Sequence, residues 1–223
     1  MRVTVIVPIF NETESLPTFL KMLDGIDEER IEFLIVDNGS TDQAVKELLQ
    51  SASGPWKSIR TEQNLGFGGG ILFGATSAKT DYVGWMPGNL KIDPRDLSKL
   101  LRDDILDNVD FLKAKRVGRG FVPQAKTFFA GLIQSLILRK RMFDSGGTPT
   151  ICRKKFLLDL ANPPQDYVFE SFVFFQARKS QLKIIRPEFY YGKRLHGHSH
   201  WQRGFRSEVI LMKRIWVSAR GWK

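Results

Sequence analysis

The chain has 223 residues, of which 42% are apolar and 26% charged, a composition typical of a globular protein with one substantial core. Lysine and arginine total 34 against 24 aspartate and glutamate. The resulting net charge of +10 indicates an anionic partner, which could be nucleic acid, an anionic membrane surface or a phosphorylated substrate.

The single cysteine, Cys152, excludes an intrachain disulfide, and the start MRVTVIVPIF lacks the long apolar run of a signal peptide. We therefore expect a reducing, cytoplasmic compartment. No segment reaches the ~20 apolar residues that span a bilayer. The nearest, FFAGLIQSLIL at 128–138, is followed by RKR, which is typical of a core helix or of an amphipathic helix lying on a membrane.

Strand and helix patterns alternate over the first hundred residues. Apolar, β-branched runs at 3–7, 33–37, 58–62 and 82–86 predict strands, and apolar residues at helical spacing between them predict helices. This alternation predicts an α/β fold with a mostly parallel sheet and helices on both faces. In such a fold the ligand site lies at the carboxyl ends of the strands.

The second half is less regular. We expect a strand at 109–113, a basic, apolar helical region at 121–141, a strand at TICRK, a helix at 166–179 and an extended stretch at LKIIRPEFYY. No repeat or linker is visible. We therefore predict one domain over 1–223, with a nucleotide-sugar half (1–105), an acceptor half (106–204) and a basic amphipathic tail (205–223).

Polar clusters follow three of the predicted strands: PIFNE, DNGSTD and PGN. The Asp37 carboxylate at a strand end can accept hydrogen bonds from a nucleobase or ribose, or simply stabilise a strand-to-helix turn. The stretch NLGFGGGILFG fits neither a phosphate-binding P-loop nor a dinucleotide fingerprint. We expect Gly68–Gly70 to let the backbone approach a ligand closely, with loop flexibility as the alternative.

At this point a family resemblance becomes specific. VIVPIFNETESLPTFL, FLIVDNGSTD, NLGFGGG and YVGWMPGNLKIDP, in this order and spacing, resemble the family 2 glycosyltransferases of the Rossmann-like GT-A fold. FLKAKR, MFDSGGTPTICRKKFL and RPEFYYGKRLHGHSHW are similar to the branch of dolichol-phosphate mannosyltransferases and related polyprenyl-phosphate glycosyltransferases. The resemblance covers roughly residues 1 to 201.

This resemblance implies an inverting hexosyltransferase. Its donor would be a GDP- or UDP-type sugar and its acceptor a polyprenyl phosphate at the cytoplasmic face of a membrane. Peripheral membrane contact and a membrane-protein partner would follow, in a pathway of cell-surface polysaccharide synthesis. No nucleic-acid-binding motif is present.

Carried over by position, the resemblance and the basic residues give a candidate site. The expected nucleotide-binding residues are Pro8, Phe10, Asn11, Glu12, Asp37, Gly66 and Gly88. The expected catalytic residues are Asn89, Arg116 and Arg194, and the expected phosphate or acceptor ligands are Lys91, Arg153, Ser199 and His200.

Pro87 and Asn89 fall where the family carries the two acids of its metal-binding D-x-D. Mg²⁺ or Mn²⁺ could still bind through substrate phosphates, with Asn89 as a weak ligand. Basic side chains could instead replace the metal, the candidates being Lys91, Lys113, Lys115, Arg116 and Arg153. The third alternative is a protein that binds a nucleotide sugar without catalysis.

The acceptor sets a second requirement. A phosphate monoester is already an anionic nucleophile, whereas a saccharide hydroxyl needs a general base. For a hydroxyl acceptor, the suitable acids are Asp144, Asp166 and Glu170. The HGHSH stretch matches no closed zinc pattern.

Overall fold

The computed structural model describes residues 2–26, 29–102, 109–192 and 205–222. In chain order its elements are β1 (Val3–Ile9), α1 (Leu16–Asp24), β2 (Ile31–Asp37), α2 (Gln43–Ser51), β3 (Trp56–Arg60), α3 (Gly66–Ser77), β4 (Tyr82–Trp85), α4 (Pro94–Arg102), β5 (Phe111–Lys113), β6 (Lys115–Val117), α5 (Phe121–Leu138), β7 (Thr150–Arg153), α6 (Lys154–Leu158), α7 (Val168–Lys179), β8 (Ile184–Ile185), β9 (Glu188–Tyr190), α8 (Phe205–Ser218) and a short 3₁₀ turn at Ala219–Gly221.

The central sheet contains seven strands in the order β3-β2-β1-β4-β7-β5-β8. Strand β1 runs parallel to both β2 and β4, and β2 runs parallel to β3. Strand β7 is antiparallel to both of its neighbours, β4 and β5. The predicted mostly parallel sheet is therefore confirmed, with one reversed strand near its centre. Strands β6 and β9 form a separate parallel pair that the sequence did not predict.

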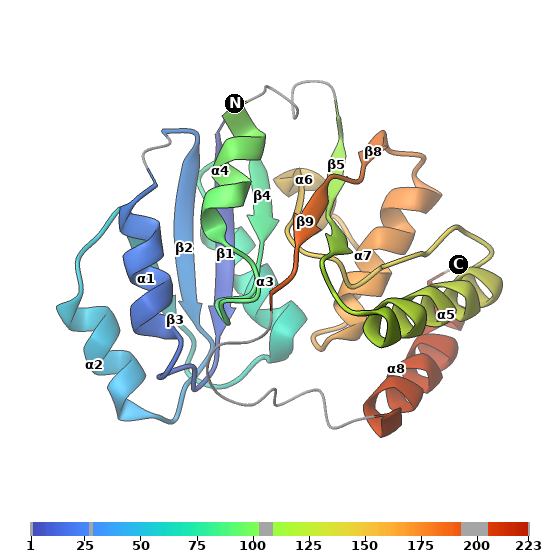
Figure 1. The fold of residues 1–223 in the computed structure, drawn as a ribbon, viewed down its shortest axis with the longest axis horizontal. Helices are drawn as coiled ribbons and strands as arrows, with labels where there is room; N and C mark the ends of the chain where they lie inside the picture. Colours follow the sequence, from blue (N-terminus) through green and yellow to red (C-terminus); the bar gives the residue numbers. More distant parts are fainter. Residues whose placement is uncertain (1, 27–28, 103–108, 193–204, 223) are drawn as a thin grey trace.

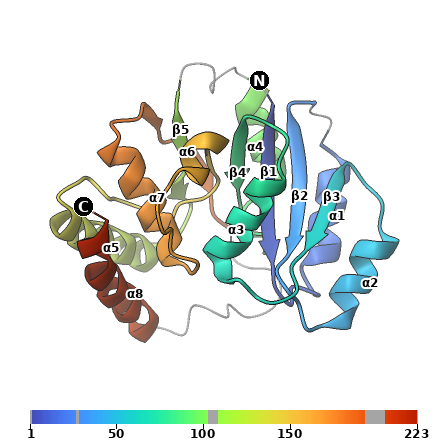
Figure 2. The same ribbon diagram turned by 180° about the vertical axis from the view of Figure 1, so that it is seen from behind.

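Helices cover both faces of the sheet, as predicted (Figures 1 and 2). Successive side chains of a strand point to opposite faces. In β1 this sends Val5 and Val7 into a core shared with α1, α2 and α4. It sends Ile6 into a second core shared with α3, α6 and α7. The alternation of β1 thus divides the apolar residues into two cores that hold the sheet between them.

Local signals fix the first helices. Helix α1 buries Leu16, Phe19, Leu20 and Leu23, the spacing of one helical face. Asp42 caps α2 by accepting a hydrogen bond from the Ala44 backbone N–H at 3.0 Å. Because these helices begin right after β1 and β2, the preceding loops are held at the carboxyl ends of those strands.

Helices α5 and α8 lie side by side, away from α1 and α2, near the carboxyl-end edge of the sheet (Figures 1 and 2). The predicted helical region 121–141 ends earlier, at Leu138, because Arg139 adopts a left-handed conformation with φ of 52°. The basic tail is helical over Phe205–Ser218 and packs Ile215 and Trp222 into the second core.

Candidate functional site

One cleft of about 840 Å³ lies at the carboxyl ends of β1, β2 and β4. One side of it is lined by residues 8–10, Glu12, Asn38, residues 87–89 and Lys91. The other side is lined by the turn after β6, the inner face of α5, residues 144–146 with Thr148, and the start of α7. This is the position that a parallel α/β sheet predicts for its ligand.

The loop after β1 gives the cleft three of its four predicted residues. Pro8, Phe10 and Glu12 line the cleft, but Asn11 does not. Asn11 has a φ of 52°, and its side-chain oxygen accepts hydrogen bonds from the backbone N–H groups of Thr41 and Asp42 at 2.9 and 3.2 Å. Asn11 therefore joins this loop to the loop after β2 and fixes the position of its cleft-lining neighbours without lining the cleft itself.

Asp37, at the end of β2, has a structural role similar to that of Asn11. Its carboxylate is buried, accepts a hydrogen bond from the Ser40 N–H at 2.9 Å and pairs with Arg60. Asp37 is not a lining residue, whereas its neighbour Asn38 is. Asn38 accepts from the Leu65 N–H at 3.1 Å and donates to the Gly66 carbonyl at 2.9 Å. A role for Asp37 toward a nucleotide remains a prediction.

The glycine-rich stretch corrects one expectation. Gly66, with a φ of 78°, lines the cleft, but the glycines after it form the first turns of α3 and pack against the protein itself. A Cβ on Gly68 would stand 2.4 Å from the Pro164 carbonyl oxygen and 2.8 Å from Phe169. Gly68–Gly70 therefore allow α3 to approach other parts of the chain, not a ligand.

The segment after β4 brings Pro87, Gly88, Asn89 and Lys91 to the cleft, as predicted. The Asn89 side-chain oxygen accepts a hydrogen bond from the Lys91 N–H at 3.3 Å. The Asn89 side chain is thus held toward its own backbone. To a metal ion, this side chain would offer one neutral oxygen ligand.

Arg116 lies opposite, on β6, and is held by Asp144. Its Nε donates to one Asp144 carboxylate oxygen at 2.7 Å and its backbone N–H to the other at 2.8 Å, and the guanidinium completes an ion pair. Burial alone would raise the pKa of Asp144, but the charge and hydrogen bonds of Arg116, helped by Arg119, hold that pKa below its ordinary value. Asp144 is therefore a fixed carboxylate anion that orients Arg116.

Arg119 is a cleft residue that the sequence analysis missed. It lies in the turn between β6 and α5 and donates from one terminal nitrogen to the Thr127 hydroxyl at 2.8 Å, while its buried Nε has no hydrogen-bond partner within the described parts of the chain. Burial and the neighbouring charge of Arg116 lower the pKa of Arg119. The signal was the GRG turn at 118–120, next to the predicted Arg116. Lys126, one helical turn into α5, also lines the cleft.

Arg153 does not lie at the cleft, where its predicted role as a phosphate or acceptor ligand would require it. It lies at the end of β7, opposite Tyr82 at the beginning of β4, and its guanidinium covers the Tyr82 ring at 5.0 Å. Because β7 runs antiparallel to β4, its last residue, Arg153, lies beside the amino end of β4, far from the cleft. Its first residue, Thr150, lies beside the carboxyl end of β4, near the cleft. The predicted residues Arg194, Ser199 and His200 lie outside the described residues.

The three acids considered as general bases all have cationic partners. Asp144 is bound to Arg116, and Asp166 pairs with Arg214 at 2.5 Å. Glu170 is bound to Lys113 at 2.5 Å and accepts from the Trp85 indole N–H at 2.7 Å. Burial lowers the pKa of Lys113, which the charge of Glu170 opposes. Among these acids, Asp144 and Glu170 reach the cleft lining, and Asp166 does not.

These donors do not fit a divalent ion held by the protein. Hard dications prefer several carboxylate or carbonyl oxygens. The described residues contain no group of three or more histidines, cysteines, aspartates or glutamates placed to hold a metal. Three carboxylates line the cleft: Glu12, Asp144 and Glu170. Asp144 and Glu170 are bound to Arg116 and Lys113, and Glu12 accepts from the Ser15 hydroxyl at 2.8 Å. At the position of the family's second acid, Asn89 offers a weak neutral oxygen.

Comparison with known proteins agrees with this geometry. Residues 4–156 match the family model described as glycosyl transferase family 2. An uncharacterized protein of Methanocaldococcus jannaschii is 29% identical over 196 residues, which cover 81% of this chain and 83% of that protein. An undecaprenyl-phosphate 4-deoxy-4-formamido-L-arabinose transferase of Serratia proteamaculans is 23% identical over 86% of this chain. The chain spans 61% of that relative's length, and 43% of the same transferase from an Enterobacter species.

Among solved structures, glucosyl-3-phosphoglycerate synthase of Mycobacterium tuberculosis, crystallised with Mn²⁺, uridine diphosphate and glucosyl-3-phosphoglycerate, aligns with a TM-score of 0.71. The alignment covers 98% of this chain and 78% of that one at 16% identity, which establishes a shared fold. The same enzyme with Mn²⁺ and uridine-diphosphate-glucose aligns with a TM-score of 0.72.

Proposed function

We propose that the chain, which belongs to glycosyl transferase family 2, transfers a sugar from a nucleoside diphosphate to a polyprenyl phosphate. Family membership and the GT-A fold make it a glycosyltransferase. The nature of donor and acceptor is our proposal. The names of the undecaprenyl-phosphate transferases support the lipid acceptor, and the uridine nucleotides bound to the structural neighbours support the donor class.

One observation carries this proposal: on the acceptor side of the cleft, two guanidinium groups share one carboxylate. Arg116 and Arg119 line the same wall, and both lower the pKa of Asp144. Two neighbouring guanidinium groups bind phosphate oxygens through charge-assisted hydrogen bonds. A phosphate on the substrate would supply the missing negative charge.

The chemistry follows from that charge. An oxygen of the acceptor phosphate attacks the anomeric carbon, the bond from this carbon to the donor's β-phosphate oxygen breaks, and the nucleoside diphosphate leaves with the electron pair. A single displacement of this kind inverts the anomeric configuration. Because the nucleophile is already an anion, no general base is required, which agrees with the cationic partners of Asp144, Asp166 and Glu170.

The leaving diphosphate needs positive charge opposite Arg116, and Lys91 lines that side of the cleft. We propose that Lys91, rather than a metal held by the protein, supplies this positive charge. Replacing Asn89 with aspartate tests this directly. We expect Asn89→Asp to make transfer more sensitive to EDTA and responsive to added Mn²⁺, while the wild type responds little. A wild type that EDTA inactivates completely would contradict the proposal.

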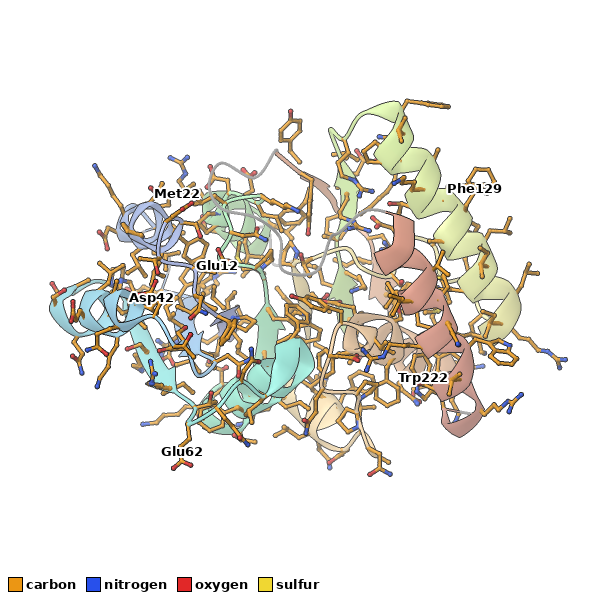
Figure 3. All side chains as sticks on the ribbon, turned by 90° about the horizontal axis from the view of Figure 1, so that it is seen from below. Glu12, Met22, Asp42, Glu62, Phe129 and Trp222 are labelled. Carbon is orange, nitrogen blue, oxygen red and sulfur yellow. The ribbon has the colours of Figure 1, made fainter. Side chains whose placement is uncertain are left out.

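We propose that the protein lies peripherally on the cytoplasmic face of a membrane; the exposed apolar side of α5 supports the contact with a membrane surface. Its apolar residues point outward: Phe128 and Phe129 are 54% and 60% exposed, and Leu136 is 72% exposed. Figure 3 shows Phe129 projecting away from the rest of the molecule. Residues 139–141, RKR, follow directly and are exposed. An exposed apolar stripe beside cationic residues is typical of a helix that lies on anionic lipid.

Among the described residues, α5 is the helix that is long and apolar enough to cross a membrane by length and composition, with 17% of it buried. Its packing favours the in-plane position, because Gly131, Gln134 and Leu138 face the protein. Replacing Phe129 and Leu136 with aspartate should lower sedimentation with anionic vesicles about tenfold. Leu158→Asp, at an exposed apolar position on α6, serves as the matched control. Equal losses in both variants would contradict docking through α5.

Transfer itself can be tested with a panel of GDP- and UDP-sugars and three acceptors: a short polyprenyl phosphate, the matching polyprenol and a neutral saccharide. We expect a mass-spectrometric product with the phosphate alone. A product with the saccharide and none with the phosphate would instead support a transferase of surface-polysaccharide synthesis. No product from any acceptor, with nucleotide binding intact, would support the binding protein without catalysis.

A further inference from the structure

We infer that the deep wall of the cleft, formed by Gln134, Ser145, Ser171 and Glu170, is a subsite for a neutral sugar ring of the donor. The inference rests on the proposed sugar-nucleotide donor and adds the residues that recognise its sugar.

The first observation is the placement of Gln134. Helix α5 carries its apolar residues outward, yet this amide points inward, is 3% exposed and lines the cleft. A buried amide is costly unless its hydrogen bonds are made. The Gln134 side-chain oxygen accepts from the Ser145 hydroxyl at 2.8 Å. Its Nε2 group has no hydrogen-bond partner within the described ranges of the chain and is not enclosed by them, so it is open to the cleft.

The second observation is the direction of the hydrogen bonds around Gln134. Ser145 gives its only proton to Gln134, so in the Ser145–Ser171 contact at 3.0 Å the proton must come from Ser171. Both hydroxyl protons are thereby used, and their oxygens keep lone pairs. The wall therefore offers N–H donors from Gln134 beside hydroxyl acceptors from two serines.

Glu170 adds a fixed carboxylate to the same lining. Its two oxygens accept from Trp85 at 2.7 Å and from Lys113 at 2.5 Å, which holds the group rigid while each oxygen keeps a further lone pair. Rigid buried donors and acceptors select a ligand by shape and hydrogen bonding, because a group that cannot pair with them leaves them unsatisfied.

The ligand that fits is a sugar bearing hydroxyl groups. Each hydroxyl both donates and accepts, which matches an amide N–H next to serine and carboxylate oxygens. The Glu170 carboxylate disfavours a phosphate at this wall. Ser145 directly follows Asp144, which holds Arg116, so the wall adjoins the proposed phosphate centre. During the proposed transfer the acceptor phosphate attacks the anomeric carbon of this sugar, so the sugar must lie next to that centre.

Gln134→Glu tests the subsite most cleanly, since it keeps an oxygen for Ser145 and removes the N–H donors. Gln134→Leu removes both. The matched control is Gln124→Glu, an exposed amide on the same helix that does not line the cleft. Binding is measured by calorimetry with UDP-glucose, UDP-N-acetylglucosamine and GDP-mannose, each compared with free UDP or GDP, and thermal unfolding verifies that each variant is folded.

We expect both Gln134 variants to bind the preferred sugar nucleotide about tenfold more weakly, the cost of one lost hydrogen bond to a buried group. Binding of the free nucleotide should change less than twofold, and Gln124→Glu should resemble the wild type. Equal losses for nucleotide and sugar nucleotide, no loss, or no sugar nucleotide bound by the wild type would overturn the subsite. These measurements involve no acceptor, so a failure of transfer to polyprenyl phosphate would refute the proposed function separately.

Discussion

The two halves of the cleft use their polar side chains differently. In the half built from β1, β2 and β4, Asn11 and Asp37 hold loops together, and the cleft is lined largely by Pro8, Phe10 and Gly88. In the half built from β6, α5 and α7, charged and polar side chains such as Arg116 and Gln134 line the cleft themselves. The first half presents mainly backbone and apolar surface beside Glu12 and Lys91, and the second is a polar wall in which Arg116 and Arg119 share the carboxylate of Asp144.

The difference teaches that motif residues and cleft-lining residues are not the same set. A polar residue at a strand end can fix a loop while its neighbour lines the cleft, as Asp37 does for Asn38. The chemistry of the second half depends on ion pairs between segments far apart in sequence.

The largest effect should come from the buried Lys113–Glu170 pair, which supports the second half. Lys113 is fully buried, so Lys113→Met leaves the Glu170 carboxylate without its cation. We expect the free energy of unfolding to fall by about 3–5 kcal/mol, measured by urea denaturation. The double variant Lys113→Met with Glu170→Gln should recover part of this loss. A single variant as stable as the wild type would show that the pair is dispensable.

Arg116→Ala should next abolish most of the transfer activity. Removing a preorganised positive group from the phosphate centre is expected to lower kcat/KM about 100-fold, or about 2.7 kcal/mol. Lys115→Ala is the control, since Lys115 lies on the same strand but is exposed and pairs with Glu188. If both variants lose activity equally, the positive charge at Arg116 has no special role.

Gly68→Ala tests whether the two halves are joined through α3. Its Cβ would collide with Pro164 and Phe169, so we expect a loss of about 1–3 kcal/mol in the free energy of unfolding. Gly120, at the start of α5, has no atom within 4 Å of a Cβ built there, and Gly120→Ala should be nearly neutral. Similar stabilities of the two variants would contradict the close packing of α3.

The smallest effect should be a pH dependence from Asp144. Its pKa is lower in the folded protein than the unfolded value of about 3.9. The carboxylate therefore stabilises the fold above that pH, and this contribution disappears as the pH falls through the lower folded value. In acid titrations followed by circular dichroism, Asp144→Asn should reduce the difference in stability between pH 6 and pH 3. If the difference in stability between pH 6 and pH 3 is the same in Asp144→Asn as in the wild type, Asp144 does not contribute to the pH dependence.

The sequence predicted the fold, and it placed several residues of the first half of the cleft, because those signals are local. Strand periodicity placed β1, β2 and β4, and with them Pro8, Glu12, Gly88 and Asn89 at the cleft. It could not place Arg153, since that depends on the reversed direction of β7 within the sheet. Nor could it show that Gln134 points inward, because the apolar stripe of α5 normally predicts the buried face, and here that stripe is exposed.

The reversal of β7 has a further consequence for how this protein can change over time. The chain leaves the sheet at Lys113 and returns at Thr150, paired with it in register, and the Ala114 N–H donates to the Pro149 carbonyl at 3.0 Å. The excursion between them carries Arg116, Arg119 and all of α5. Its two ends are paired with each other on the neighbouring strands β5 and β7. Mutation, insertion or exchange within this excursion can alter this wall of the cleft without shifting a strand of the central sheet. The fold therefore allows one wall of the cleft to change while the strands that carry the other wall keep their register.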